Sequence, residues 1–175
     1  LLEGTQASAD VTITTARYNE LLVRQARLES ERANASEMAL PKSLRRLATK
    51  PELARVVDAQ RALFAARRNS RQGERQMLTK QLDQVRSQLQ GTQVQLAARR
   101  REAAIAKEDQ TAIRSLYEKG YANRQRLSAV DRAATRLTGD TGRLMAEVAR
   151  LKNAESESSL RLLQAEKAFQ QQTLD

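Results

Sequence analysis

The chain has 175 residues and a net charge of +10, and it contains no Cys, no His and no Trp. The absence of Cys and His excludes thiol catalysis and any metal site that needs thiolate or imidazole ligands. Abundant Ala, Leu, Gln, Arg and Glu, with two Pro and few aromatic residues, is typical of long helices and coiled coils rather than of a compact domain with a thick core.

The positive charge comes mainly from Arg, which is densest at Arg67, Arg68 and Arg71 and again at residues 99–101. One interpretation is a surface for nucleic acid or anionic membrane. The other is the solvated flank of a coiled coil. We favour the second, because acidic residues are interleaved along the same stretches and aromatic residues for base stacking are nearly absent.

No stretch has the apolar length of a membrane span, and no signal peptide is visible. A first helix is expected over about residues 6–37, followed by a linker over 38–50 that Pro41 interrupts and that holds a short turn at 44–47. The expected packing stripe of this helix has steps of three and four residues and consists of Val11, Thr14, Tyr18, Leu21, Gln25 and Leu28.

A second helix is expected over about residues 51–119. Pro51 suits the first helical position, and Glu52 suits the positive end of the helix dipole. Gly73 and Gly91 interrupt the pattern and mark either bends or close approaches of a neighbouring helix. The packing stripe, or seam, of this helix is clearest at Leu78, Leu82, Val85, Leu89, Thr92 and Leu96.

A reversal is expected at residues 120–123. Gly120 can take the left-handed conformation that closes a helix, and Asn123 can cap a returning helix over about 124–172. Gly139 and Gly142 lie within that helix, which we expect to be continuous because its seam keeps phase across them. The seam consists of Leu127, Val130, Ala134, Leu137, Thr141, Leu144, Val148, Leu151, Glu155, Ser158, Leu162, Ala165 and Phe169.

These elements predict one all-α domain: a long antiparallel coiled-coil α-hairpin with an additional N-terminal helix packed alongside, in a direction that the sequence leaves open. The polar seam residues Thr141, Glu155 and Ser158 either set register and partner choice or are simply tolerated in a long, partly exposed contact. We favour tolerance. No phosphate-binding loop, acid–base pair or acidic metal cluster is present, so neither an enzyme nor a cofactor is expected.

Residues 116–127, with the sequence LYEKGYANRQRL, resemble the hairpin tip of periplasmic adaptor proteins, also called membrane fusion proteins. Three further segments are similar to the HlyD-like adaptors of type I secretion systems, in the protease and lipase exporter branch. They are residues 2–7, residues 51–53 together with 60–68, and residues 137–144. The chain opens without Met, and we expect it to be the helical-domain fragment of a longer protein.

The resemblance implies a helical domain in the periplasm, inserted between two halves of a lipoyl domain in a protein anchored in the bacterial inner membrane. Such adaptors join an inner-membrane ABC transporter to a TolC-like outer-membrane channel, usually as a ring of six protomers through which the transported protein passes. No nucleic-acid partner is expected. The alternative is a generic coiled-coil scaffold that uses its basic face for nucleic acid or anionic membrane.

By the same resemblance, the tip docks on the channel. The family's tip often carries Arg, Leu and Ser; here Leu116 holds the leucine position, Asn123 replaces the serine, and Ala112 stands at the arginine position with Arg114 nearby. We therefore expect a channel contact that differs from that of drug-efflux relatives. The candidate docking residues are Leu116, Gly120, Tyr121, Asn123, Arg114 and Leu127.

Overall fold

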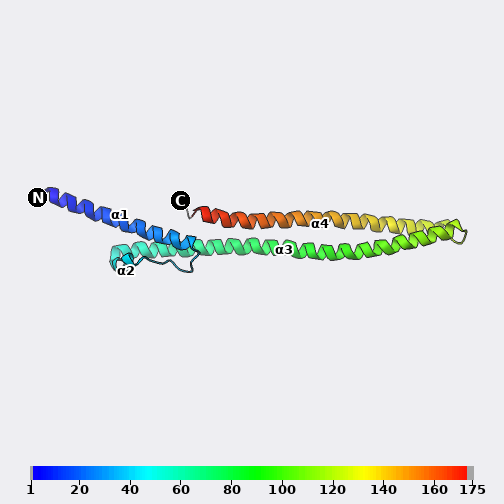
Figure 1. Cartoon of the computed structure of the whole chain (residues 1–175), viewed down its shortest axis with the longest axis horizontal. Coiled ribbons are helices and arrows are strands. Elements are labelled where there is room, and N and C mark those ends of the chain that lie inside the picture. Colours follow the sequence, from blue (N-terminus) through cyan, green and yellow to red (C-terminus); the bar gives the residue numbers. More distant parts are fainter. Residues whose placement is uncertain (1, 173–175) are drawn as a thin grey trace. The chain divides into compact units, whose positions relative to one another are not determined.

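The computed structural model describes residues 2–172, with side chains from 10 to 171 (Figure 1). The described residues form helices and no strand, which confirms the all-α prediction. The helices are α1 (Leu2–Arg32), α2 (Lys42–Leu47), α3 (Pro51–Glu118) and α4 (Arg124–Gln172). Their contacts gather in two compact units: one holds α1, α2, α3 up to Met77 and α4 from Leu162, and the other holds Leu78–Arg161.

The unit of Leu78–Arg161 is an antiparallel pair of helices joined by a short reversal. Buried and half-buried side chains follow α3 in alternating steps of four and three residues, the spacing of a coiled-coil seam. Leu82, Leu89 and Leu96 are buried, and Leu78 and Val85 are half-buried between them. Towards the reversal the α3 seam continues through smaller and polar side chains to a buried Ile113. These are Thr92, Arg99, Ala103, Ala106 and Gln110.

The facing seam of α4 is continuous through Gly139 and Gly142, so the expected unbroken helix is confirmed. Leu151 is buried, and Leu137, Leu144 and Val148 are half-buried. Leu162 is also half-buried and belongs to the other unit. The suggested close approaches at Gly73 and Gly91 are absent, because a Cβ built on either glycine meets no heavy atom within 4 Å.

The other unit is organised around the first turns of α3. α1 packs against them in parallel: Arg27 contacts Gln60, Glu31 contacts Arg67, and residue numbers rise together along both helices. Residues 33–41 then run back along the first turns of α3 to α2 (Figure 1). The side chains of the loop and of α2 complete one apolar core. Its buried members are Val23, Ala26, Met38, Leu40, Leu44, Val57 and Phe64.

The first helix ends at Arg32, earlier than the expected boundary near residue 37. Asn34 takes a left-handed φ of 52°, and its N–H donates to the carbonyl of Glu31 at 3.1 Å. The N–H of Ala35 donates to the carbonyl of Ser30 at 3.0 Å, which completes a Schellman cap. Asn is the non-glycine residue that most readily adopts this conformation, so Asn34 stops the helix.

The predicted packing stripe of the first helix is wrong. Val11, Tyr18 and Leu21 are exposed, together with Thr14 and Gln25, and Leu28 alone is half-buried. The side that packs on α3 carries Val23, Ala26, Arg27, Ser30 and Glu31. Leu21 lies about 160° around the helix from Val23, on the far side. Arg27 and Glu31 are charged, so a pattern of apolar residues alone does not identify this side of the helix.

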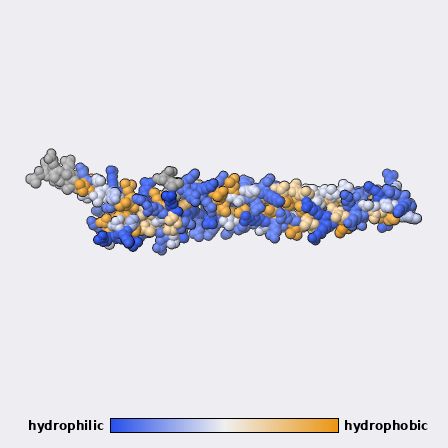
Figure 2. Space-filling view, in the orientation of Figure 1, coloured by the Kyte–Doolittle hydropathy of each residue, from blue (hydrophilic) through white to orange (hydrophobic). Residues whose placement is uncertain are grey.

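From residue 10 to residue 18 every side chain of α1 is exposed. This part of α1 diverges from the start of α3 and leaves a crevice of about 580 Å³. Its walls include Val11, Ala16, Leu47, Leu53 and Val56. In the face shown in Figure 2, hydrophobic side chains otherwise form small groups separated by hydrophilic ones.

Candidate interaction surface at the hairpin tip

The hairpin tip, residues 116–127, begins where α3 is closed by a Schellman cap. Gly120 has a φ of +80°, and its N–H donates to the carbonyl of Tyr117 at 2.9 Å. The N–H of Tyr121 donates to the carbonyl of Leu116 at 2.8 Å. A Cβ at residue 120 would meet open space, so the requirement for glycine here is conformational rather than steric. The predicted role of Gly120 in closing the helix is confirmed.

The returning helix is capped by the residue expected to cap it. Asn123 Oδ1 accepts a hydrogen bond from the N–H of Arg126 at 2.8 Å. This bond satisfies one of the amides that the first turn of a helix leaves without an intrahelical partner. Only Tyr121 and Ala122 lie between the cap that ends α3 and the cap that begins α4. The reversal is therefore tight, with few free backbone torsions.

The reversal presents apolar and aromatic side chains to solvent. Tyr121 is 81% exposed, and Leu116 and Tyr117 are exposed on the last turn of α3. Leu127 is half-buried at the first seam position of α4. Sequence reasoning did not single out Tyr117, although an aromatic residue adjacent to Leu116 was the available signal. The surface that could contact a partner thus combines Leu116, Tyr117 and Tyr121.

Arg114, the remaining candidate, is engaged within the hairpin. Its Nη2 lies 3.1 Å from Asp131 Oδ1 on α4, and the same oxygen accepts a hydrogen bond from Gln110 Nε2 at 2.8 Å. The six candidate residues therefore divide by role. Leu116 and Tyr121 are exposed, Gly120 and Asn123 shape the backbone, and Leu127 and Arg114 hold the arms together.

Two polar seam residues of α4, Thr141 and Glu155, have partners inside the chain. Glu155 Oε1 forms an ion pair with Arg86 Nε of α3 at 2.9 Å, and Thr141 Oγ1 donates to the carbonyl of Leu137 at 2.8 Å. The bond of Thr141 lies within α4 and agrees with tolerance, whereas the pair of Glu155 and Arg86 joins the two arms and is compatible with either interpretation.

Several arginines of the two basic runs also have partners. Arg67 forms an ion pair with Glu31 at 3.5 Å, Arg71 donates to Asn34 Oδ1 and lies 3.9 Å above the Phe169 ring, and Arg99 pairs with Glu102 at 2.5 Å. Each of the two basic runs therefore contains at least one arginine that is paired or used in packing, as expected for the flank of a coiled coil.

On the exposed side of α4, a side-chain hydrogen bond from Arg150 lowers the pKa of the Glu147 carboxyl below its usual value. Exposed pairs of this kind contribute little to stability and do not indicate a reactive site. Within the described residues, no three acidic side chains converge as a metal site would require. No described helix is long and apolar enough to cross a membrane.

Comparison with known proteins gives matches of three kinds. Residues 7–175 match the family model described as "AprE, long alpha-helical hairpin". The type I secretion system membrane fusion protein PrsE of Rhizobium meliloti (strain 1021) is 28% identical over 163 residues, which are 93% of this chain and 37% of the relative. The chain therefore spans little more than a third of that relative's length.

The third match is a solved structure, the soluble domain of LipC, a membrane fusion protein of a type I secretion system. It superposes with a TM-score of 0.88 at 26% sequence identity, covering 96% of this chain and 79% of the other. The resemblance to membrane fusion proteins inferred from the tip and the three further segments is thereby confirmed, as is the long hairpin fold.

Proposed function

Because the chain belongs to the family of AprE-type long α-helical hairpins, we propose that it is the helical arm of a periplasmic adaptor for type I protein secretion. In this role the protein, anchored in the inner membrane, links an ABC transporter to a TolC-like outer-membrane channel. The arm is structural: it spans distance and presents its tip, and it performs no catalysis.

The observation that carries the proposal is the construction of the tip. A backbone cap at Gly120 and a side-chain cap at Asn123 hold the reversal, which exposes Leu116, Tyr117 and Tyr121. Aromatic side chains lose little conformational entropy on binding and contribute disproportionately to protein interfaces. A rigid tip with three exposed apolar groups therefore suits docking on the end of a protein channel.

The ring of adaptors and the passage of the transported protein follow from the same family assignment. Six arms around a common axis would enclose a conduit, with their tips meeting the channel together. The weak contribution of a single small tip would then be multiplied, because simultaneous contacts raise the effective concentration of each further contact.

The test uses the full-length adaptor in a bacterium that carries the secretion system. The variant Leu116→Ser/Tyr121→Ser removes two exposed apolar contacts and leaves both caps in place. We expect co-purification of the channel and secretion of the substrate to fall at least tenfold, while adaptor abundance and helical circular dichroism stay unchanged.

The matched control is Met145→Ser/Leu160→Ser, which changes two exposed apolar residues on the arm away from the tip. It should secrete normally. Normal secretion by the tip variant at normal abundance would overturn the docking role. Salt-sensitive binding of DNA or anionic vesicles near physiological ionic strength would instead support the scaffold alternative.

A further inference from the structure

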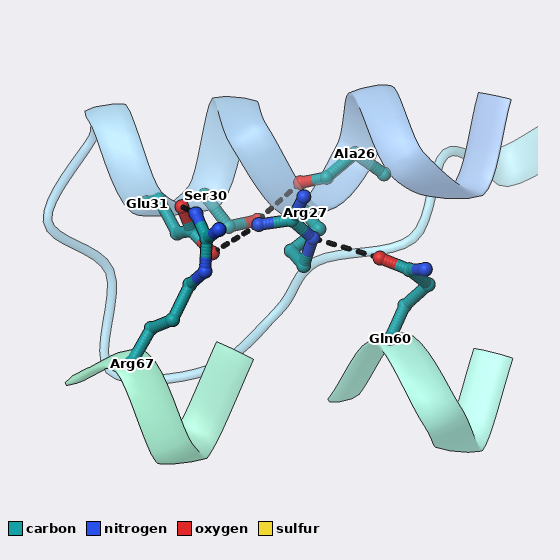
Figure 3. Close-up of polar contacts among 6 residues, drawn as sticks. All are labelled: Ala26, Arg27, Ser30, Glu31, Gln60 and Arg67. Atoms are coloured by element: carbon teal, nitrogen blue, oxygen red, sulfur yellow. Dashed lines mark hydrogen bonds and ion pairs between the residues drawn. The ribbon is translucent and has the colours of Figure 1, made fainter. Parts of the chain in front are cut away.

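Charged side chains are buried where α1 packs on α3. Arg27 is 5% exposed and Glu31 4% exposed, and Ser30 is buried between them (Figure 3). Charged residues are almost never buried to this degree unless they are paired. α1 and α3 already share an apolar core. Packing alone therefore does not require these buried polar groups at the contact between the two helices.

The cluster connects the two helices through a small number of directional contacts. Arg27 Nη1 donates to Glu31 Oε1 at 2.5 Å, and Arg27 Nε donates to Gln60 Oε1 of α3 at 2.7 Å. Arg67 Nη1, also on α3, lies 3.5 Å from Glu31 Oε2 (Figure 3). That second carboxylate oxygen is buried and makes no hydrogen bond with the described residues, so Arg67 is its compensating charge.

Ser30 attaches the returning loop to the same place. Its hydroxyl donates to the carbonyl of Ala26 at 2.7 Å and accepts the N–H of Ala39 at 3.1 Å. The polar contacts therefore connect three segments of this unit: α1, the loop of residues 33–41 and α3.

Directional contacts and apolar contacts constrain a helix differently. The apolar core of Val23, Ala26, Val57 and Phe64 gains from burial, which has no preferred direction and tolerates a shift along the helix axis. The bond from Arg27 to Gln60 exists in one register. A slip of one turn moves Arg27 by about 5.4 Å and leaves its guanidinium buried without that acceptor, which is strongly unfavourable.

We propose that Arg27, Glu31 and Gln60 form a register lock, which fixes the axial position of α1 on α3. Buried polar groups that select one register at a cost in stability are known from coiled coils. The axial position of α1 in turn sets where its exposed turns, residues 10–18, stand beside the start of α3. The lock belongs to the construction of the arm and does not depend on whether the tip docks on a channel.

The test measures register directly. Because the chain has no Cys, nitroxide labels can be placed at Arg24→Cys on α1 and Gln76→Cys on α3, both exposed positions. Arg27 lies beside Gln60, so these two labels are offset by roughly 28 Å along the helix axes. The distance between them therefore follows an axial shift nearly in full. Distances between the labels by pulsed electron paramagnetic resonance should form one peak in the parent. In Arg27→Leu/Glu31→Leu/Gln60→Leu we expect additional peaks displaced by about 5 Å, one helical turn, with an unfolding midpoint that is not lowered.

Gln60→Leu is a second, gentler variant that keeps the Arg27–Glu31 pair and should show a smaller fraction of the same displaced peaks. Glu157→Leu/Arg161→Leu removes an exposed pair of the same spacing on α4 and should leave the parent peak unchanged. A single parent peak in both lock variants would overturn the proposal. The proposal would also be overturned if the triple variant gave a featureless distance distribution while Gln60→Leu gave a single peak. The cluster would then hold α1 against α3 without selecting its register.

Discussion

Arg114 on α3 and Asp131 on α4 are joined across the hairpin, with Nη2 3.1 Å from Oδ1. Gln110 donates to the same carboxylate oxygen at 2.8 Å, so one acidic residue holds two positions of the facing arm. The contact lies one turn before the cap that closes α3. Arg114 thus holds the two arms together. Such cross-arm contacts fix the arms near the tip, where the seam consists largely of small residues.

Replacing Asp131 by Ala should loosen the tip. The variant loses both cross-arm bonds, and we expect a stability loss of about 1 kcal/mol, since the groups are partly exposed. Hydrogen exchange of the amides of residues 117–122 should quicken severalfold. Asp140→Ala is the control, because Asp140 pairs with Arg143 of its own helix. Equal exchange at the tip in the two variants would contradict the cross-arm role of Asp131.

Replacement of glycine by alanine should raise the stability of the hairpin at one position and lower it at another. Gly91→Ala has open space for its methyl group in a regular helix and should stabilise the hairpin by about 0.5–1 kcal/mol. Gly120→Ala has the same space but a φ of +80°, so it should destabilise by about 1 kcal/mol or more. Urea unfolding followed by circular dichroism measures both. A destabilising Gly91→Ala would mean that the helix is not regular there.

Substitutions of Asn123 can distinguish a role in shaping the backbone from a role in docking. Asn123→Ala should lower stability by about 1 kcal/mol, whereas Asn123→Ser and Asn123→Asp should keep most of it, because each retains an oxygen that can accept the Arg126 N–H. Thermal unfolding ranks the three variants. If Asn123→Ser keeps the stability but abolishes secretion, the Asn123 amide contacts a partner itself and the purely structural role is wrong.

The seam should be far more sensitive than the exposed side of the same helix. Leu151 is 3% exposed, and Leu160 is 52% exposed. Leu151→Ala should cost about 2–3 kcal/mol through lost burial and the cavity left between the arms, while Leu160→Ala should change stability by less than about 0.5 kcal/mol. Chemical denaturation distinguishes them, and similar losses at both positions would show that the seam has been placed on the wrong side of α4.

The hairpin was predictable because its signals are local or periodic. Gly120 and Asn123 are residues that commonly cap helix ends, so they indicate where α3 ends and α4 begins. The spacing of seam residues from Leu127 to Phe169 identifies the packing side of α4 even when the facing helix is not known. The same signals identified Gly120 and Asn123, which shape the reversal, while contact of the six candidate residues with a channel stays a prediction. Nothing in the sequence marked Asp131 as the partner of Arg114, because that pairing depends on how the two arms align.

The first helix was predicted less well for a physical reason. Apolar spacing favoured Val11, Tyr18 and Leu21, yet α1 packs through the side that carries Arg27 and Glu31. Burial of these two charges depends on Gln60 and Arg67, which are more than 25 residues away along the chain and come near only when α1 docks. The end of α1 at Arg32 likewise depends on a left-handed Asn34, a conformation that Asn adopts only in suitable surroundings.

The most direct test of the proposed function is site-specific photo-crosslinking from the tip in living cells. A photoreactive phenylalanine analogue replaces Tyr121 in the full-length adaptor, and in a matched strain it replaces Met145 on the arm. If the tip docks on the channel, position 121 should cross-link to the outer-membrane channel and position 145 should not. Absence of a channel cross-link from position 121 in cells that still secrete, or equal cross-linking from both positions, would contradict docking of the tip.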